Sequence, residues 1–184
     1  MHQTDAIPYE SAAQREQAAQ WSALVGTRRT ASTLLAARGV RDVVRTSWQR
    51  SLAARIRPDL DAAPVVLDES AVQDATIHTD WYGVASEAIA RHRTMRAGDG
   101  HILTLFDQDA RMLAAEGDAA ALEGLAEINF RPGGDWSERA VGTNGPGTAL
   151  ATGAATHIVG AEHFVERWHR WHCAAVPIKD PATG

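Results

Sequence analysis

The spacing of the apolar residues changes once along this chain of 184 residues, at Gly98. Before Gly98, apolar residues recur at helical intervals. One stripe recurs every fourth position and is ended by Pro58; it comprises Val44, Trp48, Leu52 and Ile56. After Gly98, short apolar runs alternate with turn residues, as is typical of strands. The pattern predicts an N-terminal helical part followed by a mixed part, an α+β chain.

Two further helices are expected in the first part. In the earlier of these two helices, helical spacing places Trp21, Leu24, Val25, Leu34 and Leu35 together, with Gly39 as a C-terminal cap. Residues 61–70 resemble a linker, after which Ser70 is expected to cap a long helix. The residues that share one face of that helix are Ile77, Trp81, Val84, Ala85, Ala88, Ile89 and His92.

The second part predicts a hairpin of residues 101–106 and 110–115, joined by Asp107, Gln108 and Asp109. A helix over 120–130, a long ordered loop over 131–147 and a short helix over 147–153 follow, with Asn144 or Gly145 as cap. Strands are expected at 155–160 and 173–180, with a helix at 161–171 between them. The chain ends in residues typical of a hairpin turn, so we expect a segment of a longer protein.

Composition and charge exclude several classes of protein. The chain is 45% hydrophobic, which is enough for a core, and it has no apolar run near the length of a membrane span. Its single cysteine, Cys173, cannot form an intrachain disulfide, which favours a cytoplasmic protein. Residues 28–57 hold eight arginines and one acid, Asp42. These arginines either bind DNA or a protein partner, or pair with acids elsewhere in the chain.

The glycine-rich stretch from Ser137 to Gly153 does not match a catalytic or phosphate-binding motif. A P-loop needs a lysine, and the only lysine is Lys179. A dinucleotide fingerprint has different spacing, and the G-x-S-x-G elbow of hydrolases is absent. Cys173 has no positioned base in the sequence, so we expect a buried, inert thiol and no enzyme.

Histidines gather in the last quarter of the chain. Five possible metal ligands lie within seventeen residues: His157, His163, His169, His172 and Cys173. Their spacing matches no metal motif, which favours packed histidines that line a cavity, with no metal or cofactor. A haem-based or iron-based sensor stays open as an alternative.

The segments "FRPGGDWSERAVGTNGPGTAL", "EHF" and "WHCAAVPIKDPATG" resemble the GAF sensory domain of bacterial transcriptional regulators. The similarity is to acetoin-catabolism-type, sigma-54-dependent enhancer-binding regulators, and it extends from about residue 41 to 184. The resemblance implies an antiparallel sheet flanked by helices, with a cavity above one face for a small organic effector. It also implies an ATPase domain and a helix-turn-helix, neither of which this chain contains, so DNA binding is expected only through absent domains.

On this resemblance we expect an extension and linker over 1–66 and a sensory domain over 67–184, without its final strand and helix. Glycines 142, 145 and 147 are expected to let backbone segments approach closely, as scaffolding. The candidate pocket residues are Phe130, Trp136, Thr143, Asn144, Thr148, His163, Phe164, Trp168, His169 and Cys173. Occupancy is expected to shift the helix from Trp81 to Ile89 and to alter the pairing of a homodimer. No membrane partner is expected.

Overall fold

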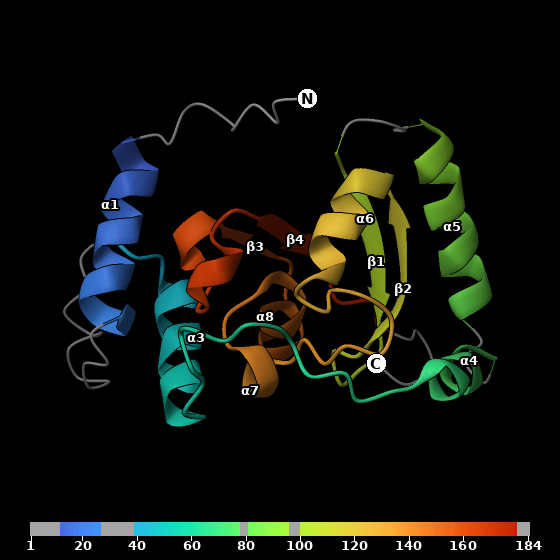
Figure 1. Ribbon diagram of the computed structural model, residues 1–184, viewed down its shortest axis with the longest axis horizontal. Coiled ribbons are helices and arrows are strands. Elements are labelled where there is room, and N and C mark those ends of the chain that lie inside the picture. Colours follow the sequence, from blue (N-terminus) through green and yellow to red (C-terminus); the bar gives the residue numbers. More distant parts are fainter. Residues whose placement is uncertain (1–11, 27–38, 78–80, 96–99, 180–184) are drawn as a thin grey trace.

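The structure is a computed structural model that describes residues 12–26, 39–77, 81–95 and 100–179. The α-helices in chain order are α1 (Ala12–Trp21), α3 (Asp42–Ala53), α4 (Glu69–Ile77), α5 (Tyr82–Met95), α6 (Ala119–Ala126), α7 (Glu138–Val141) and α8 (Gly145–Thr152). The strands are β1 (Ile102–Phe106), β2 (Met112–Gly117), β3 (Thr156–Val159) and β4 (His172–Ala175). A π-helical turn, η1 (Ser22–Gly26), extends α1, and two 3-10 turns, η2 (Gly160–Glu162) and η3 (Glu166–Trp168), lie between β3 and β4. The elements form an α+β domain with α1 and α3 at one end and α4 and α5 at the other (Figure 1).

The N-terminal helices form one buried cluster with the C-terminal part of the chain. The predicted stripe is confirmed on α3 for Val44 and Trp48, which are fully buried, and for Leu52, which packs against the same core. The helix ends at Ala53 rather than at Pro58, because Arg55 turns to positive φ, so Ile56 reaches this core from beyond the helix. Trp21 and Val25 join this cluster from α1 and η1, and Ile158 and Phe164 join it from the far end of the chain. Leu34 and Leu35 lie outside the described residues. The expected linker is held to the loop after α6, where Val66 donates a 2.9 Å backbone hydrogen bond to Gly133.

The long third helix was predicted as one element, but the structure describes two helices, α4 and α5, with residues 78–80 between them outside the description. Asp68 rather than Ser70 caps α4, because its carboxylate accepts from the backbone of Ala71 at 2.8 Å. The residues from Ile77 to Ile89, predicted to share one face, differ in burial. Ile89 is buried, whereas the side chains of Ile77 and Val84 are 67% and 74% exposed.

The predicted hairpin is confirmed. Strands β1 and β2 pair antiparallel from Ile102 opposite Gly117 to Phe106 opposite Met112. The Asp107 carboxylate accepts from the backbone of Asp109 and of Arg111 at 2.9 Å each, which fixes the turn. Helix α5 contacts both strands, and α6 contacts β2 (Figure 1). The hairpin therefore has a helix on each side.

Strands β3 and β4 form a second antiparallel pair, so the described residues contain two two-stranded sheets in place of one continuous sheet. A helix was predicted over 161–171 and is wrong: two short 3-10 turns are found there. His163 and Val165 have extended backbone angles, and residues 161–165 are all buried. A helix cannot bury five consecutive side chains on one face, so the chain turns instead. The predicted loop over 131–147 also contains a helix, α7.

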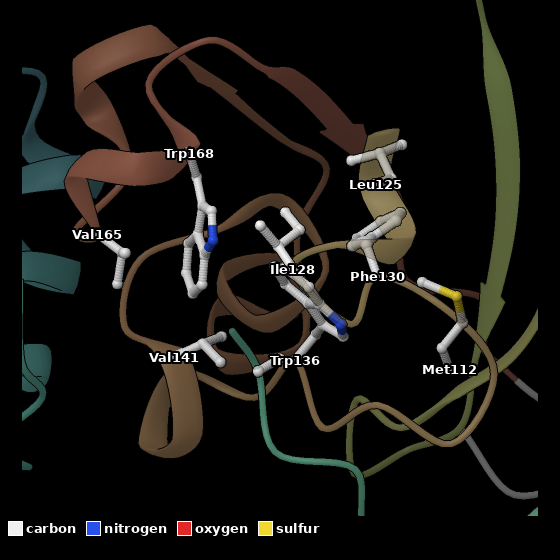
Figure 2. Close-up of a cluster of buried hydrophobic side chains, with 9 residues drawn as sticks. Met112, Leu125, Ile128, Phe130, Trp136, Val141, Val165 and Trp168 are labelled. Atoms are coloured by element: carbon white, nitrogen blue, oxygen red, sulfur yellow. The ribbon is translucent and has the colours of Figure 1, made fainter. Parts of the chain in front are cut away.

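A second buried cluster lies between the hairpin, α6 and the turn η3 (Figure 2). Its aromatic rings contact each other in series: Phe130 to Trp136 with centroids 4.5 Å apart, and Trp136 to Trp168 at 4.9 Å. Within the described part of the chain, no helix is both long and apolar enough to span a bilayer.

Candidate functional site

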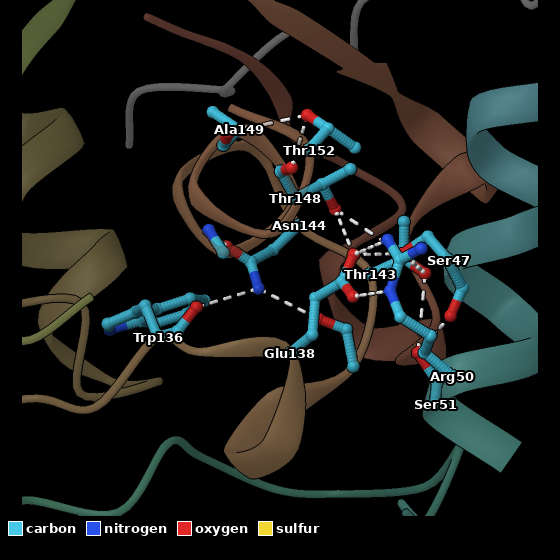
Figure 3. A network of polar contacts seen from close by, with 12 residues as sticks. Ser47, Arg50, Ser51, Trp136, Glu138, Thr143, Asn144, Thr148, Ala149 and Thr152 are labelled. Carbon is cyan, nitrogen blue, oxygen red and sulfur yellow. Dashed lines mark hydrogen bonds and ion pairs between the residues drawn. The ribbon is translucent and has the colours of Figure 1, made fainter. Parts of the chain in front are cut away.

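Asn144 organises the glycine-rich segment. Its side-chain oxygen accepts from the backbone of Gly147 at 2.9 Å, which makes it the N-cap of α8. Its amide nitrogen donates to the carbonyls of Trp136 at 2.9 Å and Gly142 at 2.8 Å (Figure 3). Both amide hydrogens are therefore used inside the protein.

The glycines of this segment lie so close to other segments of the chain that a Cβ atom would not fit. Gly142 has φ +71°, and a Cβ atom there would lie 2.7 Å from Cβ of Phe164. A Cβ at Gly145 would lie 2.7 Å from Cβ of Cys173 on β4. The expectation that these glycines allow close approach of the backbone is confirmed.

A buried polar network joins this segment to α3, and Glu138 is its centre (Figure 3). Glu138 Oε1 accepts from the hydroxyls of Ser47 and of Thr148, the latter at 2.8 Å, and from Arg50 Nη2 at 2.8 Å. Thr143 lies 2.6 Å from the Ser47 hydroxyl. The hydrogen bonds from Arg50 to Glu138 raise the pKa of Arg50. The network fixes α7 and α8 against α3.

Sequence reasoning missed Ser47, Arg50, Ser51 and Glu138 as members of this network. A signal for two of them was present: Ser47 and Ser51 share the helical face of Val44 and Trp48. Two hydroxyls on a buried face require polar partners elsewhere in the chain. Thr143 and Thr148 were predicted as pocket residues, and the structure places both in the network.

The arginines of α3 and its flanks pair with acids of the same chain. Arg41 donates from Nε to Glu162 at 2.6 Å, and Glu162 is buried. The arginines in ion pairs with Asp or Glu are Arg41, Arg45, Arg50 and Arg57. Part of the positive charge of residues 28–57 therefore balances acids within this domain.

A cavity of about 160 Å³ lies between the two strand pairs. It is lined by Ile102 and Thr104 of β1, by Leu125 of α6, and by His172 and Cys173 of β4. No Asp, Glu, Lys or Arg lines it among the described residues. The predicted pocket residues on the wall are Phe130, Trp136, Asn144, His163, Trp168 and Cys173. The structure places Thr143, Thr148, Phe164 and His169 outside this lining.

His163 and Cys173 form a neutral pair on the wall. His163 Nδ1 lies 2.9 Å from the Gly160 carbonyl, which only accepts, so Nδ1 carries the proton and Nε2 accepts. The Cys173 sulfur lies 3.4 Å from Nε2. Burial lowers the pKa of His163 from 6.5 to about 4 and raises the pKa of Cys173 from 9.0 to about 11. The thiol is protonated at neutral pH and is a poor nucleophile.

His169 belongs to the contact with α1. Its ring packs edge-on against Trp21 with centroids 4.6 Å apart, and its Nε2 donates to the carbonyl of His163 at 3.2 Å. Burial lowers its pKa to about 4. Among the residues that the structure describes, no three His, Cys, Asp or Glu side chains converge on a position where a metal ion could bind.

The fold is GAF-like, with helices around two antiparallel strand pairs. It is similar to the solved Escherichia coli DhaR(N)-DhaL complex, with a TM-score of 0.70 and 20% identity, over 76% of this chain and 48% of that chain. The family described as "MimR, N-terminal domain" matches residues 25–184. The chain therefore belongs to the family of MimR N-terminal domains.

Two relatives of the chain are transcriptional activators. It is 33% identical over 140 residues to the acetoin dehydrogenase operon transcriptional activator AcoR of Bacillus subtilis. It is 30% identical over 150 residues to the propane 2-monooxygenase operon transcriptional activator MimR of Mycolicibacterium smegmatis. Each match covers 76% of this chain and 23% of the relative. A 47.3 kDa protein in the thcA 5′ region of Rhodococcus erythropolis is 37% identical over 152 residues, 79% of this chain and 33% of that protein. The predicted resemblance to acetoin-type regulators is confirmed.

Proposed function

We propose that this chain is the effector-binding domain of a transcriptional regulator and that a small, uncharged organic molecule binds in the cavity between β1 and β4. The observation that supports this most is the wall itself, which is aromatic, free of Asp, Glu, Lys and Arg, and placed inside a domain of this family. Ligand sites are typically apolar cavities with a few fixed polar groups. An ionic effector would lose its hydration without gaining a counter-charge, which disfavours it.

The cavity volume limits the size of the effector. A protein cavity of roughly 150 Å³ holds benzene, so about 160 Å³ suits a molecule of about six non-hydrogen atoms. The names of AcoR and MimR connect those relatives to operons for acetoin and propane metabolism. Metabolites of that size are the effectors that we propose to test.

Binding of an effector in the cavity would change the position of the hairpin. Ile102 and Thr104 of β1 line the cavity, and α5 packs on β1 and β2. A ligand that displaces β1 would therefore move α5. We propose that α4, Trp81 and α5 pair two copies of the chain, because Ile77, Trp81 and Val84 are exposed there. Sedimentation of the chain as a monomer at high concentration would contradict this pairing.

The proposal can be tested by a substitution on α6 that places a larger side chain in the cavity. Ala121 lines the cavity, whereas its neighbour Ala120 is exposed on the same helix. A compound at 100 times its Kd stabilises the native state by about 2.7 kcal/mol. For a domain of this size that raises Tm by about 5–10 °C. A thermal-shift screen of small neutral metabolites should find such a compound for the wild type.

We expect the same compound to stabilise the Ala120→Phe variant and to have no effect on the Ala121→Phe variant, in which the phenyl ring occupies the cavity. Stabilisation that persists in Ala121→Phe would place the binding site elsewhere. A screen without a single stabilising compound would reject the proposed function.

A further inference from the structure

The buried tryptophans differ in how their indole N–H groups are paired. Trp21 donates to the carbonyl of Phe164 at 3.1 Å, Trp48 to that of Glu162 at 2.8 Å, and Trp136 to that of Asn129 at 3.4 Å. Trp168 is equally buried, and its Nε1 has no hydrogen-bond partner among the residues that the structure describes. A buried donor without a partner costs free energy, so native proteins rarely contain one without a reason.

The unpaired group belongs to the wall of the cavity. Trp168 lines it, and in Figure 2 its indole nitrogen faces the side chain of Ile128, another wall residue. The ring of Trp136 is near, with centroids 4.9 Å apart, and offers at most a weak N–H···π contact. The donor therefore lies within the wall of the cavity, behind other wall side chains that a bound ligand would contact.

Two other polar side chains on the wall have already formed hydrogen bonds within the protein. Asn144 donates both of its amide hydrogens to backbone carbonyls, and His163 donates Nδ1–H to Gly160. The other ring nitrogen of His163, Nε2, faces the thiol of Cys173. Among the described residues, Trp168 is therefore the buried side chain of the wall whose donor hydrogen is not already bonded.

We propose that the indole N–H of Trp168 is the donor by which the cavity selects a neutral ligand with an acceptor oxygen over a hydrocarbon of the same shape. This inference rests on the proposed function, because it assumes that the cavity binds an effector. Wall side chains cover the nitrogen in the structure, so binding includes a small rotamer change at the wall, as is common on association. An incoming carbonyl or hydroxyl oxygen then satisfies the buried donor, and a hydrocarbon leaves it unpaired.

The test uses two probes of one shape, cyclopentanone and methylenecyclopentane, which differ in an oxygen replaced by a CH₂ group. Affinities are measured by calorimetry, and the indole N–H resonances are followed by ¹H–¹⁵N NMR. We expect the ketone to bind about tenfold more tightly and to move the Trp168 indole proton downfield. Trp168→Phe should abolish the preference for the ketone. Trp48→Phe is the control, because that buried indole is paired with the carbonyl of Glu162 and lies outside the cavity lining, and it should keep the preference.

Equal affinity of the two probes, or a ketone preference that survives in Trp168→Phe, would overturn the role of Trp168 and leave the proposed function in place. Failure of both probes and of a panel of small ketones and alcohols to bind the wild type would overturn both. If Trp168→Phe does not fold, the chemical shift of the Trp168 indole in the wild type decides, since a ketone that binds without moving it contradicts the inference.

Discussion

Replacing Arg50 by methionine should destabilise the domain far more than the same change at Arg45, five residues earlier on α3. Arg50 pairs with Glu138, whose side chain is 6% exposed, whereas Arg45 pairs with Asp42, whose side chain is 87% exposed. Without Arg50, the Glu138 carboxylate stays buried, and its remaining side-chain donors among the described residues are the hydroxyls of Ser47 and Thr148.

The magnitude follows from these exposures. Removing one partner of a fully buried ion pair costs about 3–5 kcal/mol. The Arg50 side chain is 38% exposed, so water screens part of the interaction. We therefore expect a loss of about 2–3 kcal/mol in the free energy of unfolding. An exposed pair such as Arg45 and Asp42 contributes under about 0.5 kcal/mol.

Urea denaturation measures both variants. With an m-value of about 2 kcal/mol/M, the midpoint of Arg50→Met should fall by about 1–1.5 M, and that of Arg45→Met by under about 0.3 M. Adding Glu138→Gln to Arg50→Met removes the unpaired charge, so the double variant should be more stable than Arg50→Met alone. Equal midpoints for Arg50→Met and Arg45→Met would refute the argument that Glu138 depends on Arg50.

Two further predictions concern the glycine-rich segment and the buried histidine. Gly142→Ala should cost about 2–4 kcal/mol, because it combines positive φ with a contact on Phe164. Gly153→Ala has positive φ but open space around it, and should cost only about 1 kcal/mol; equal losses in thermal unfolding would refute the steric argument. Folding lowers the pKa of His163 from 6.5 to about 4, so the native state disfavours its protonation and the unfolded state binds the proton first. The stabilisation is complete above pH 6.5 and is lost as the pH falls toward 4, by up to about 3 kcal/mol. His163→Asn should flatten this decline in urea titrations, whereas the exposed His157→Gln should not; an unchanged slope in His163→Asn would count against neutral burial.

Local patterns in the sequence predicted the elements that depend on local chemistry. The four-residue period of Val44 and Trp48 identified α3, and the turn residues from Asp107 to Asp109 identified the hairpin. The cap of α8 was predicted at Asn144 or Gly145, and Asn144 provides it. Each of these signals lies within a few residues of the structure that it specifies.

Elements that depend on distant partners were not predictable in this way. Residues 161–165 have helical composition, but they are all buried between segments that the sequence does not place, and they form turns. Glu138 gave no local sign of its pairing with Arg50, 88 residues away. Six of the candidate pocket residues line the cavity, but Ile102, Thr104 and Leu125 were missed, because periodicity shows which face is buried and not where the packing leaves space.

The most direct test of the central claim, that the cavity between β1 and β4 binds a small neutral molecule, is a crystal structure of the chain grown with the compound that stabilises it most. We expect electron density for that compound inside the cavity, with an oxygen within hydrogen-bond distance of Trp168 Nε1. Density for the compound on another surface, with the cavity side chains in their present positions, would contradict it.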